Sequence, residues 1–443
     1  MGGKQREHHA ASTLDASPRK PYDSAFPFPQ SSAPKNPLMN PSPFSVSRQW
    51  RQLLALTFAH AVTDTFVGLI APVLVPMHDR TGASLALLIF VASMLGFSSN
   101  IFQLPIGNMR STWTHPLPIC FGVLLAGAAV LIPCMPAGPH CVAWMSLVAL
   151  AAGFGVAIVH PEGLRAVHGL DKISSSLSTA IFMVAGFLGF AGGALLSSTL
   201  TEHFGLTSLA WLYAAAPVAA TLLFLSGIRL PIETEKAKTA LEHKENIPSI
   251  PFWPLFMMAA LLATCSQIQA TLLPTYLHKE VGYSLSFSGF SFTLFGLGGM
   301  VGAITWGALA PRIGHLRVLL YSTLVGAPLT AVYLVLAPHT RLAAILLTFT
   351  AFIVYTGFPL CITLARYADS PLRFGQRMGL ISGGSWGIAA VVLWTLAPVS
   401  EHTGMGPLLH LIWIGYLIAA ALTVWLIRQR RRGHDVGGGS REA

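Results

Sequence analysis

The chain has 443 residues, of which 53% are hydrophobic and only 10% are charged, against roughly a quarter charged in a typical soluble domain. Its mean hydropathy is +0.61, which excludes a water-soluble fold because too few polar residues are available to cover the apolar ones. The net charge of +10 would suggest a nucleic-acid partner in a soluble protein, but its distribution along this chain has another explanation, given below.

The first 48 residues form a predicted polar tail. They contain eight prolines and several serines, and they lack both a continuous apolar core and a signal-peptide pattern. A segment of this composition cannot bury enough apolar surface to offset the conformational entropy lost on folding. We therefore expect residues 1–48 to be disordered.

Beyond the tail, twelve stretches of near 20 residues carry few or no charges, the length that crosses about 30 Å of hydrocarbon at about 1.5 Å per residue. The predicted fold is therefore an all-α membrane protein with twelve transmembrane helices. A polar linker at 230–251 divides it into two six-helix halves, 49–229 and 252–428, and a basic, glycine-rich tail follows at 429–443. The expected spans are 50–75, 83–106, 115–133, 141–165, 174–200, 207–228, 252–277, 286–310, 315–336, 341–366, 375–398 and 406–428.

The positive charges are unevenly divided between the two sides of this bundle. If the N-terminus is cytoplasmic, 24 of the 27 Lys and Arg residues lie in cytoplasmic segments, and the exceptions are Arg80, Lys279 and Arg341. Cytoplasmic loops of membrane proteins collect positive charge. We therefore expect a multi-pass protein of the cell inner membrane with both termini cytoplasmic. The positive charge then requires no nucleic-acid partner.

The first predicted span contains a polar pair, His60 and Asp64. Of the 17 acidic residues only Asp64 and Glu162 fall within predicted spans, and a carboxylate inside the membrane is costly unless it is paired or hydrated. Asp64 lies about 20 Å along the helix from Arg51, near the midplane, where transporters bind substrates. His60, one turn earlier, lies on the same helical face. The pair is predicted to couple transport to protons. The alternative is a buried pair that only fixes helix packing.

Three amides and one tryptophan are candidate linings of a substrate cavity. Asn100 and Gln103 belong to the second span, Gln267 to the seventh and Trp386 to the eleventh. Hydrogen bonds between helices explain the amides equally well, and packing against lipid explains the tryptophan.

The fourth span ends in VAIVHPEGLRAVHG, residues 156–169. Counting from the outer end of the helix places His160 about 27 Å along it, close to the cytoplasmic boundary. Pro161 interrupts the helical hydrogen-bond ladder, and Glu162 and Arg165 can pair on one face. We interpret His160, Glu162 and Arg165 as a gate or coupling group at the inner mouth of the cavity, with an interfacial salt bridge as the alternative.

The two halves of the chain contain similar sequence features at corresponding spans. The second span ends in QLPIGNMR and the eighth in WGALAPRIGHLR, where we predict that Gly307, Arg312 and Gly314 form an inter-helix turn. The fifth span, FMVAGFLGFAGGALLSS, and the eleventh, RMGLISGGSWGIAA, are both rich in glycine, which allows close helix packing. A parallel duplication of six-helix units is the architecture of major facilitator transporters.

Several stretches resemble the fosmidomycin resistance protein family, a drug-exporting branch of the major facilitator superfamily. They are HAVTDTF at 60–66, QLPIG at 103–107, GFGVAIVHPEGLRAV at 153–167, FMVAGFLGFAGGALL at 182–196 and LLPTYLHKEVGYS at 272–284. The resemblance covers nearly all of residues 50–428. It implies a major facilitator fold and export of a small molecule. One departure is that Ala310 and Pro311 precede Arg312, where the superfamily signature carries an acidic residue.

The predicted function is secondary active transport rather than enzymatic catalysis. The sequence contains no GxxxxGK[ST] nucleotide-binding motif, so we expect an ion gradient to supply the energy. The resemblance favours proton-coupled antiport that exports a small molecule or drug. The main alternative is a proton-coupled uptake symporter for an organic acid or other metabolite. A remote alternative is an intramembrane metalloenzyme that uses His60, Asp64, His160 and Glu162 as ligands. We expect a monomer in the lipid bilayer, without cofactor or metal.

Overall fold

The computed structural model of the chain describes residues 43–108, 114–231, 250–366, 368–372 and 374–438. These residues form helices and short connections, with one isolated β-bridge between Pro251 and Asp369. Ten of the helical segments are long and apolar enough to cross a membrane, and two shorter apolar helices accompany them. The predicted all-α fold with twelve spans is therefore confirmed. Most of the predicted tail and linker lies outside the described residues.

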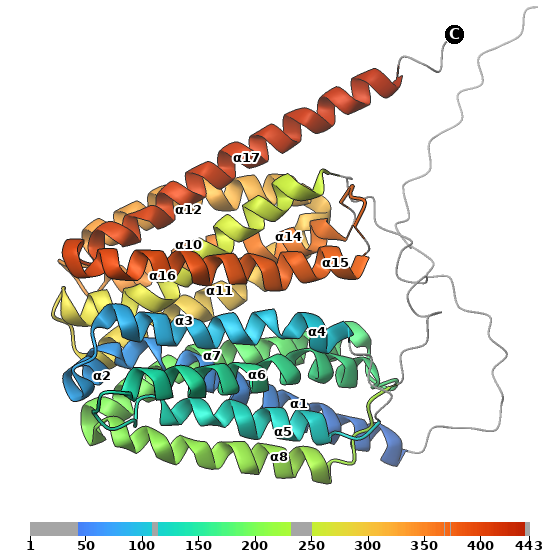
Figure 1. Ribbon diagram of the computed structural model, residues 1–443. Coiled ribbons are helices and arrows are strands. Elements are labelled where there is room, and N and C mark those ends of the chain that lie inside the picture. The colour runs from blue at the N-terminus through green and yellow to red at the C-terminus, as the bar shows by residue number, and fades with distance from the viewer. Residues whose placement is uncertain (1–42, 109–113, 232–249, 367, 373, 439–443) are drawn as a thin grey trace, which may run out of the picture. The chain divides into compact units, whose positions relative to one another are not determined.

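The first six spans form the N-terminal half, which runs from blue to green in Figure 1. Its elements are α1 (Pro43–Gly68), the 3-10 helix η1 (Ala71–Val73), α2 (Leu74–Thr81), α3 (Leu85–Ile101), α4 (Gln103–Asn108), α5 (Leu117–Ala126), the 3-10 helix η2 (Gly127–Leu131), α6 (Cys141–His168), α7 (Ser175–Phe204), the 3-10 helix η3 (Leu206–Ala214) and α8 (Ala215–Leu225).

The remaining six spans form the C-terminal half, which runs from yellow-green to red in Figure 1. Its elements are α10 (Phe252–Lys279), α11 (Leu285–Ile313), α12 (His315–Leu336), α13 (Ala343–Val354), α14 (Gly357–Ala365), α15 (Phe374–Gly379), the π-helical turn η4 (Leu380–Gly384), α16 (Ser385–Thr403) and α17 (Gly406–Gly438).

The helices depart from the predicted spans in several places. Helix α1 begins at Pro43, inside the segment predicted as tail, and α17 continues to Gly438, beyond the predicted span end at 428. The second span is divided near Phe102 into α3 and α4. The eleventh contains the π-helical turn η4, a deviation that is frequent at functional sites.

Glycines bring α1 and α7 into backbone contact, as the glycine-rich fifth span predicts. A Cβ atom on Gly189 would lie 2.1 Å from the carbonyl oxygen of Ala61, and one on Gly193 would lie 2.4 Å from that of Thr65. Both distances are far below van der Waals contact. Small residues allow membrane helices to approach this closely, and the approach places the middle of α7 directly against His60 and Asp64.

Two carboxylates join the halves at the end of the bundle opposite the start of α1 and the end of α17 (Figure 1). Glu202 in the last turn of α7 accepts a 2.6 Å hydrogen bond from the backbone N–H of Ser286 at the start of α11. Glu401 in the last turn of α16 accepts a 3.1 Å bond from the N–H of Ala86 at the start of α3. A residue at the end of the fifth span thus caps the start of the eighth, and a residue at the end of the eleventh caps the start of the second. The two contacts are therefore equivalent under the relation between the two halves. Each places a negative charge at a helix N-terminus, where it is favourable.

We expect the double variant Glu202→Gln, Glu401→Gln to open this end of the bundle more often. Loss of two charged caps is expected to raise the ratio of open to closed molecules about fivefold to thirtyfold. Pulsed electron paramagnetic resonance measures the distribution of distances between spin labels on the facing ends of α7 and α11, and this distribution gives the ratio. Glu280→Gln is the control, because Glu280 accepts bonds from the N–H groups of Met405 and Gly406 within one half. An unchanged distance distribution in the double variant would show that the caps do not hold the halves together.

Candidate functional site

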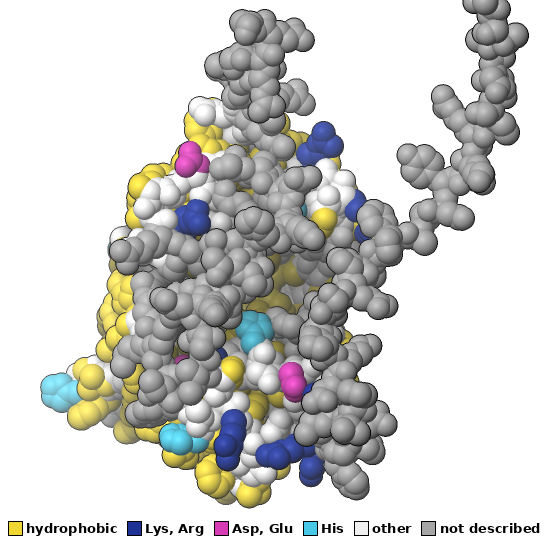
Figure 2. Space-filling view, turned by 90° about the vertical axis from the view of Figure 1, so that its right-hand side faces the viewer, with side chains coloured by type: hydrophobic (Ala, Val, Ile, Leu, Met, Phe, Trp, Pro, Cys, Tyr) yellow, Lys and Arg dark blue, Asp and Glu magenta, His cyan; other side chains and the backbone are white. Residues whose placement is uncertain are grey.

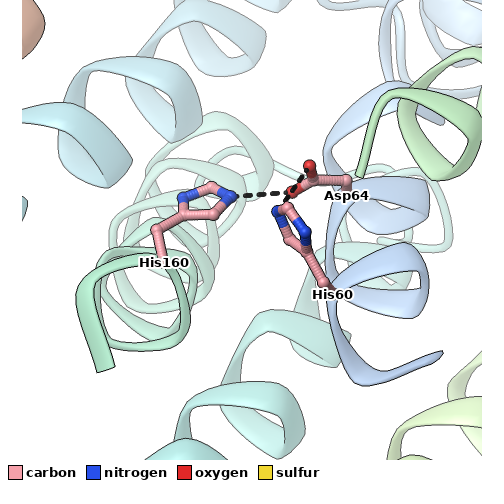
Figure 3. A group of neighbouring side chains, drawn as sticks. All are labelled: His60, Asp64 and His160. Carbon is pink, nitrogen blue, oxygen red and sulfur yellow. Dashed lines mark hydrogen bonds and ion pairs between the residues drawn. The ribbon is translucent and has the colours of Figure 1, made fainter. Parts of the chain in front are cut away.

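A cluster of three side chains lies between α1 and α6 (Figure 3). The Asp64 carboxylate contacts two imidazoles. Nε2 of His60, in the preceding turn of α1, lies 3.3 Å from Oδ2, and Nε2 of His160, on α6, lies 3.0 Å from Oδ1. The side chains become more accessible along the cluster, from 3% exposed in His60 through 17% in Asp64 to 28% in His160. One carboxylate therefore lies between a buried and a partly accessible imidazole.

The position of His160 corrects the estimate of its depth from the sequence. Counting residues placed it at the membrane boundary, well apart from Asp64, but the two side chains are in hydrogen-bond contact. Helix α6 has 28 residues and is therefore about 42 Å long, which exceeds the hydrocarbon thickness of about 30 Å. Because the helix end does not coincide with the boundary, counting from that end does not give the depth.

The contact made by the other ring nitrogen of His60, Nδ1, determines the orientation of the ring and which nitrogen carries a hydrogen. Nδ1 lies 2.7 Å from the carbonyl oxygen of Phe182, and the two rings stack with centroids 4.0 Å apart. A carbonyl oxygen only accepts hydrogen bonds, so Nδ1 carries the hydrogen. Nε2 of a neutral His60 would then point a lone pair at the Asp64 carboxylate 3.3 Å away. Two facing acceptors at this distance repel, so one additional proton must lie between His60 and Asp64.

His160 completes the cluster without a further charge. Its Nε2 is 3.0 Å from Asp64 Oδ1, and its Nδ1 is 3.4 Å from the amide nitrogen of Gln103. A neutral ring satisfies both contacts by donating to the carboxylate and accepting from the amide. The cluster with one additional proton on His60 or Asp64 is therefore electrically neutral, and loss of that proton leaves it with a net charge of −1.

Gly186 of α7 lies against this cluster. A Cβ atom there would come within 2.4 Å of Cε1 of His60 and 2.6 Å of Oδ2 of Asp64. The sequence indicates the glycine-rich span but not this position, because glycines on one helix cannot be distinguished by residue type. The carbonyl of Phe182 was also missed, since a backbone atom leaves no signal in the sequence.

Asp64 and His160 open onto a cavity between the two halves, with a volume of about 260 Å³. The four residues predicted as cavity linings, Asn100, Gln103, Gln267 and Trp386, all line it. The amides of Asn100 and Gln103 also donate to backbone carbonyls of α3, at 2.8 and 2.9 Å. Their carbonyl oxygens retain acceptor capacity toward the cavity.

Glu162 and Arg165 form a separate pair outside the set of residues that line the cavity. Their side chains are 2.5 Å apart and about nine-tenths buried. Arg165 also donates to the carbonyl oxygen of Pro231 at 3.5 Å, which connects α6 to the segment after α8. Pro161 lies within α6, and the helix continues beyond it to His168. The structure therefore brings His160 to Asp64 but leaves the other two members of the predicted gate in an ion pair of their own.

The predicted turn after the eighth span lies between α11 and α12. Arg312 is in the last turn of α11, and Gly314 connects the helices with φ +102°, a conformation that favours glycine. Gly307 lies two turns earlier, with open space where a side chain would be. The corresponding turn of the first half falls partly on residues 109–113, outside the described part of the chain.

The three-residue cluster has the chemistry to hold a cation. The ligand atoms of His60, Asp64 and His160 all lie within 4.8 Å of one another, and imidazoles with a carboxylate can bind either a proton or a divalent metal ion. Glu162, the fourth residue of the metalloenzyme hypothesis, is paired with Arg165. One additional proton is sufficient to satisfy the hydrogen-bond contacts within this cluster.

Comparison with known sequences identifies the architecture. The sequence model of the Major Facilitator Superfamily matches residues 56–393. The chain belongs to this superfamily. It is therefore a multi-pass membrane transporter of the secondary type and not an enzyme, as the sequence predicted, and the transporters of this superfamily carry small molecules.

Two relatives in the superfamily span nearly the whole chain. The fosmidomycin resistance protein of Escherichia coli (strain K12) is 22% identical over 394 residues, which cover 85% of this chain and 93% of that protein. The uncharacterised transporter YfnC of Bacillus subtilis (strain 168) is 24% identical over 392 residues, which cover 85% of this chain and 92% of that one. The predicted resemblance to the fosmidomycin resistance branch is thus confirmed.

Solved transporter structures share the fold. A bacterial homologue of the human lysosomal transporter Spinster, crystallised in an inward-facing and unoccupied conformation, superposes with a TM-score of 0.66 at 16% identity and covers 87% of this chain and 98% of that one. A peptide transporter in complex with sulfate gives a TM-score of 0.65 at 15% identity, with coverage of 86% and 95%. At these identities the likeness establishes the fold alone.

Proposed function

We propose that this transporter is a proton-coupled antiporter that exports a small molecule. The proposal rests on the two hydrogen-bond acceptors that face each other at His60 and Asp64. The Phe182 carbonyl holds the Nδ1 hydrogen of His60, so Nε2 and the carboxylate, 3.3 Å apart, require one more proton between them. A proton bound within a transmembrane helix, next to a cavity, is the arrangement that proton coupling requires.

Competition for Asp64 provides the coupling. Asp64 both holds the proton and lines the cavity, so a substrate that engages its carboxylate displaces the proton, and the proton displaces the substrate. Alternating occupancy of one site, combined with alternating access from the two sides, moves proton and substrate in opposite directions. His160, which contacts both Asp64 and the cavity, provides the path by which the proton leaves.

The surface charge supports a proposal for the orientation in the membrane. The end of the bundle where α1 begins and α17 ends carries clustered basic side chains (Figure 2). Its exposed basic residues include Arg48, Arg51, Lys172, Arg229, Arg312, Arg317 and Arg366. We place this end, and both termini, on the cytoplasmic side of the inner membrane. The name of the fosmidomycin resistance relative supports the export direction.

The Glu162–Arg165 pair is proposed to set the inner gate of the same cycle. It lies one turn from His160 on α6 and is bonded to Pro231 after α8, so its geometry depends on how α6 and α8 pack. Breaking a buried ion pair leaves an uncompensated charge, which opposes motion that separates the two side chains. We propose that the monomer is the transporting unit.

Transport in proteoliposomes under an imposed pH gradient tests the proposal and its main alternative. Antiport predicts that substrate accumulates in vesicles with an acidic interior, because protons leave as substrate enters, whichever way the protein is inserted. Symport, the uptake alternative, predicts accumulation in vesicles with an alkaline interior. A panel of organic cations, anions and neutral compounds identifies the substrate, and a protonophore is the control. Substrate accumulation that does not depend on the pH gradient would exclude both proton antiport and proton symport.

A further inference from the structure

An indole of the C-terminal half is inserted between two aromatic rings of the N-terminal half. The ring centroid of Trp394 on α16 lies 5.2 Å from that of Phe90 and 5.1 Å from that of Phe97, both on α3. Its Nε1–H donates a 2.5 Å hydrogen bond to Oγ of Ser93, which lies between the two phenylalanines along α3. Residues 90, 93 and 97 are spaced by three and four, so their side chains share one face of the helix. These four residues form the α3–α16 seam, which joins the two halves through side chains.

Each partner of this hydrogen bond depends on the other. Ser93 is fully buried and donates its own hydrogen to the carbonyl oxygen of Phe90 at 2.9 Å. An indole N–H can only donate, so the Trp394 nitrogen needs an acceptor, and the Ser93 oxygen supplies one. Loss of either partner leaves the other without this bond in a contact that water does not fill.

The seam lies between the cavity and the capped end of the bundle, where Glu401 accepts a bond from Ala86. Ser93 is seven residues beyond Ala86 on α3, and Trp394 is seven residues before Glu401 on α16. Both therefore lie about 10 Å from the cap. Trp386, two turns farther from the cap on α16, lines the cavity, whereas the four seam residues are not among the described residues that line it. Separation of α3 from α16 at the seam would connect the cavity to the capped end.

The equivalent contact between the halves, α7 against α11, is built differently. A Cβ atom on Gly289 would lie 2.5 Å from the carbonyl oxygen of Ala194. One on Gly296 would lie 2.6 Å from Cβ of Ala191, whose carbonyl oxygen accepts a 2.6 Å bond from Thr293. Helices this close lose packing along two turns when they separate, whereas an indole can leave its place by rotation about two side-chain bonds. The α3–α16 seam is therefore the easier of the two contacts to open.

We propose that Trp394 is a gate residue of this transporter. Its hydrogen bond to Ser93 holds α3 against α16, and opening of the capped end separates these two helices more widely than it separates α7 and α11. The indole suits both states, because its ring packs in the closed contact and its N–H can donate to water in the open one. The inference goes beyond the proposed function, since it requires alternating access but neither proton coupling nor a particular direction of transport.

Distances between spin labels on the full-length protein in liposomes test the gate. Labels in place of Leu87 and Val399 report on α3 and α16, and labels in place of Phe204 and Phe290 report on α7 and α11. All four of these side chains are exposed. Cys134→Ser provides the background for labelling, because the other four cysteines are buried. Pulsed electron paramagnetic resonance then gives the distance distribution for each pair.

Trp394→Phe keeps an aromatic ring between Phe90 and Phe97 but removes the N–H donor. We expect it to raise the ratio of open to closed molecules, measured by the 87/399 pair, about twofold to tenfold. The open molecules are expected to show a smaller increase in distance for the 204/290 pair. Trp413→Phe is the control, because it removes an indole hydrogen bond to His410 within α17, and we expect no change.

Ser93→Ala tests the same bond from the other side. It removes the acceptor and is expected to raise the ratio as Trp394→Phe does. The double variant is expected to open no further than either single variant, because both changes remove one bond. Thermal unfolding of each variant shows whether it is folded.

Three results would overturn the gate. They are an unchanged 87/399 distribution in either folded single variant, an increase in the 204/290 distance that equals or exceeds the 87/399 increase, and additive effects in the double variant. Each leaves the proposed proton-coupled transport untouched. The expected rise in open molecules, together with substrate accumulation that does not depend on a pH gradient, would support the gate and contradict the proton coupling.

Discussion

Asp64→Asn is expected to abolish substrate accumulation driven by a pH gradient. An amide cannot exchange a proton with His60 or His160, so the variant has no group at this position that couples substrate movement to proton movement. A one-proton antiporter accumulates substrate about tenfold per pH unit, whereas the variant is expected to reach only equal concentrations on both sides. Proteoliposomes with matched amounts of protein and an acidic interior provide the measurement.

Counterflow distinguishes loss of coupling from loss of transport in the same variant. Exchange of labelled for unlabelled substrate requires no net proton movement, so we expect it to persist in Asp64→Asn when substrate is raised above the weakened affinity. Glu280→Gln, a carboxylate-to-amide change within one half, is expected to behave as wild type in both assays. Wild-type accumulation by Asp64→Asn would move the coupling role to another residue.

Gly186→Ala is expected to impair transport nearly as strongly, although it introduces only a methyl group. The new Cβ atom would lie within 2.6 Å of His60 Nε2 and Asp64 Oδ2, so both side chains must move and the hydrogen bond from His60 to the Phe182 carbonyl is disturbed. We expect an overpacking penalty of about 1–3 kcal/mol in stability. Gradient-driven accumulation and the thermal unfolding midpoint are measured on the same preparation.

Two glycines of the same helix serve as references for Gly186. Gly192 has no heavy atom within 4 Å of its added Cβ, so Gly192→Ala is expected to retain wild-type transport. Gly189→Ala would place its Cβ 2.1 Å from the backbone of Ala61, and we expect it to lose stability as well as transport. Full proton-driven transport by Gly186→Ala would show that the geometry of the cluster is not critical.

The architecture could be predicted from the sequence because the bilayer restricts the solutions. Inside hydrocarbon every backbone polar group must be bonded internally, so each long uncharged stretch must be a helix, and the spacing of such stretches gives their number. The same reasoning singled out Asp64, since a carboxylate in a span needs a partner. His60 could be paired with it because residues one helical turn apart share a face.

The rest of the site depends on how helices cross, which a single sequence does not specify. His160 reaches Asp64 because α6 packs against α1. Gly186 could not be singled out from the other glycines of α7 without knowing which of them faces α1. The π-helical turn before Trp386 likewise depends on backbone geometry and changes which side chains of α16 face the cavity.

The most direct test of the account is proton release when substrate binds to purified protein. A pH indicator in weakly buffered detergent solution, near neutral pH, follows the proton while saturating substrate is added. The proposed competition of substrate and proton for Asp64 predicts release of about one proton per wild-type molecule and none from Asp64→Asn. Substrate binding to the wild type without proton release would contradict the proposed exchange at Asp64.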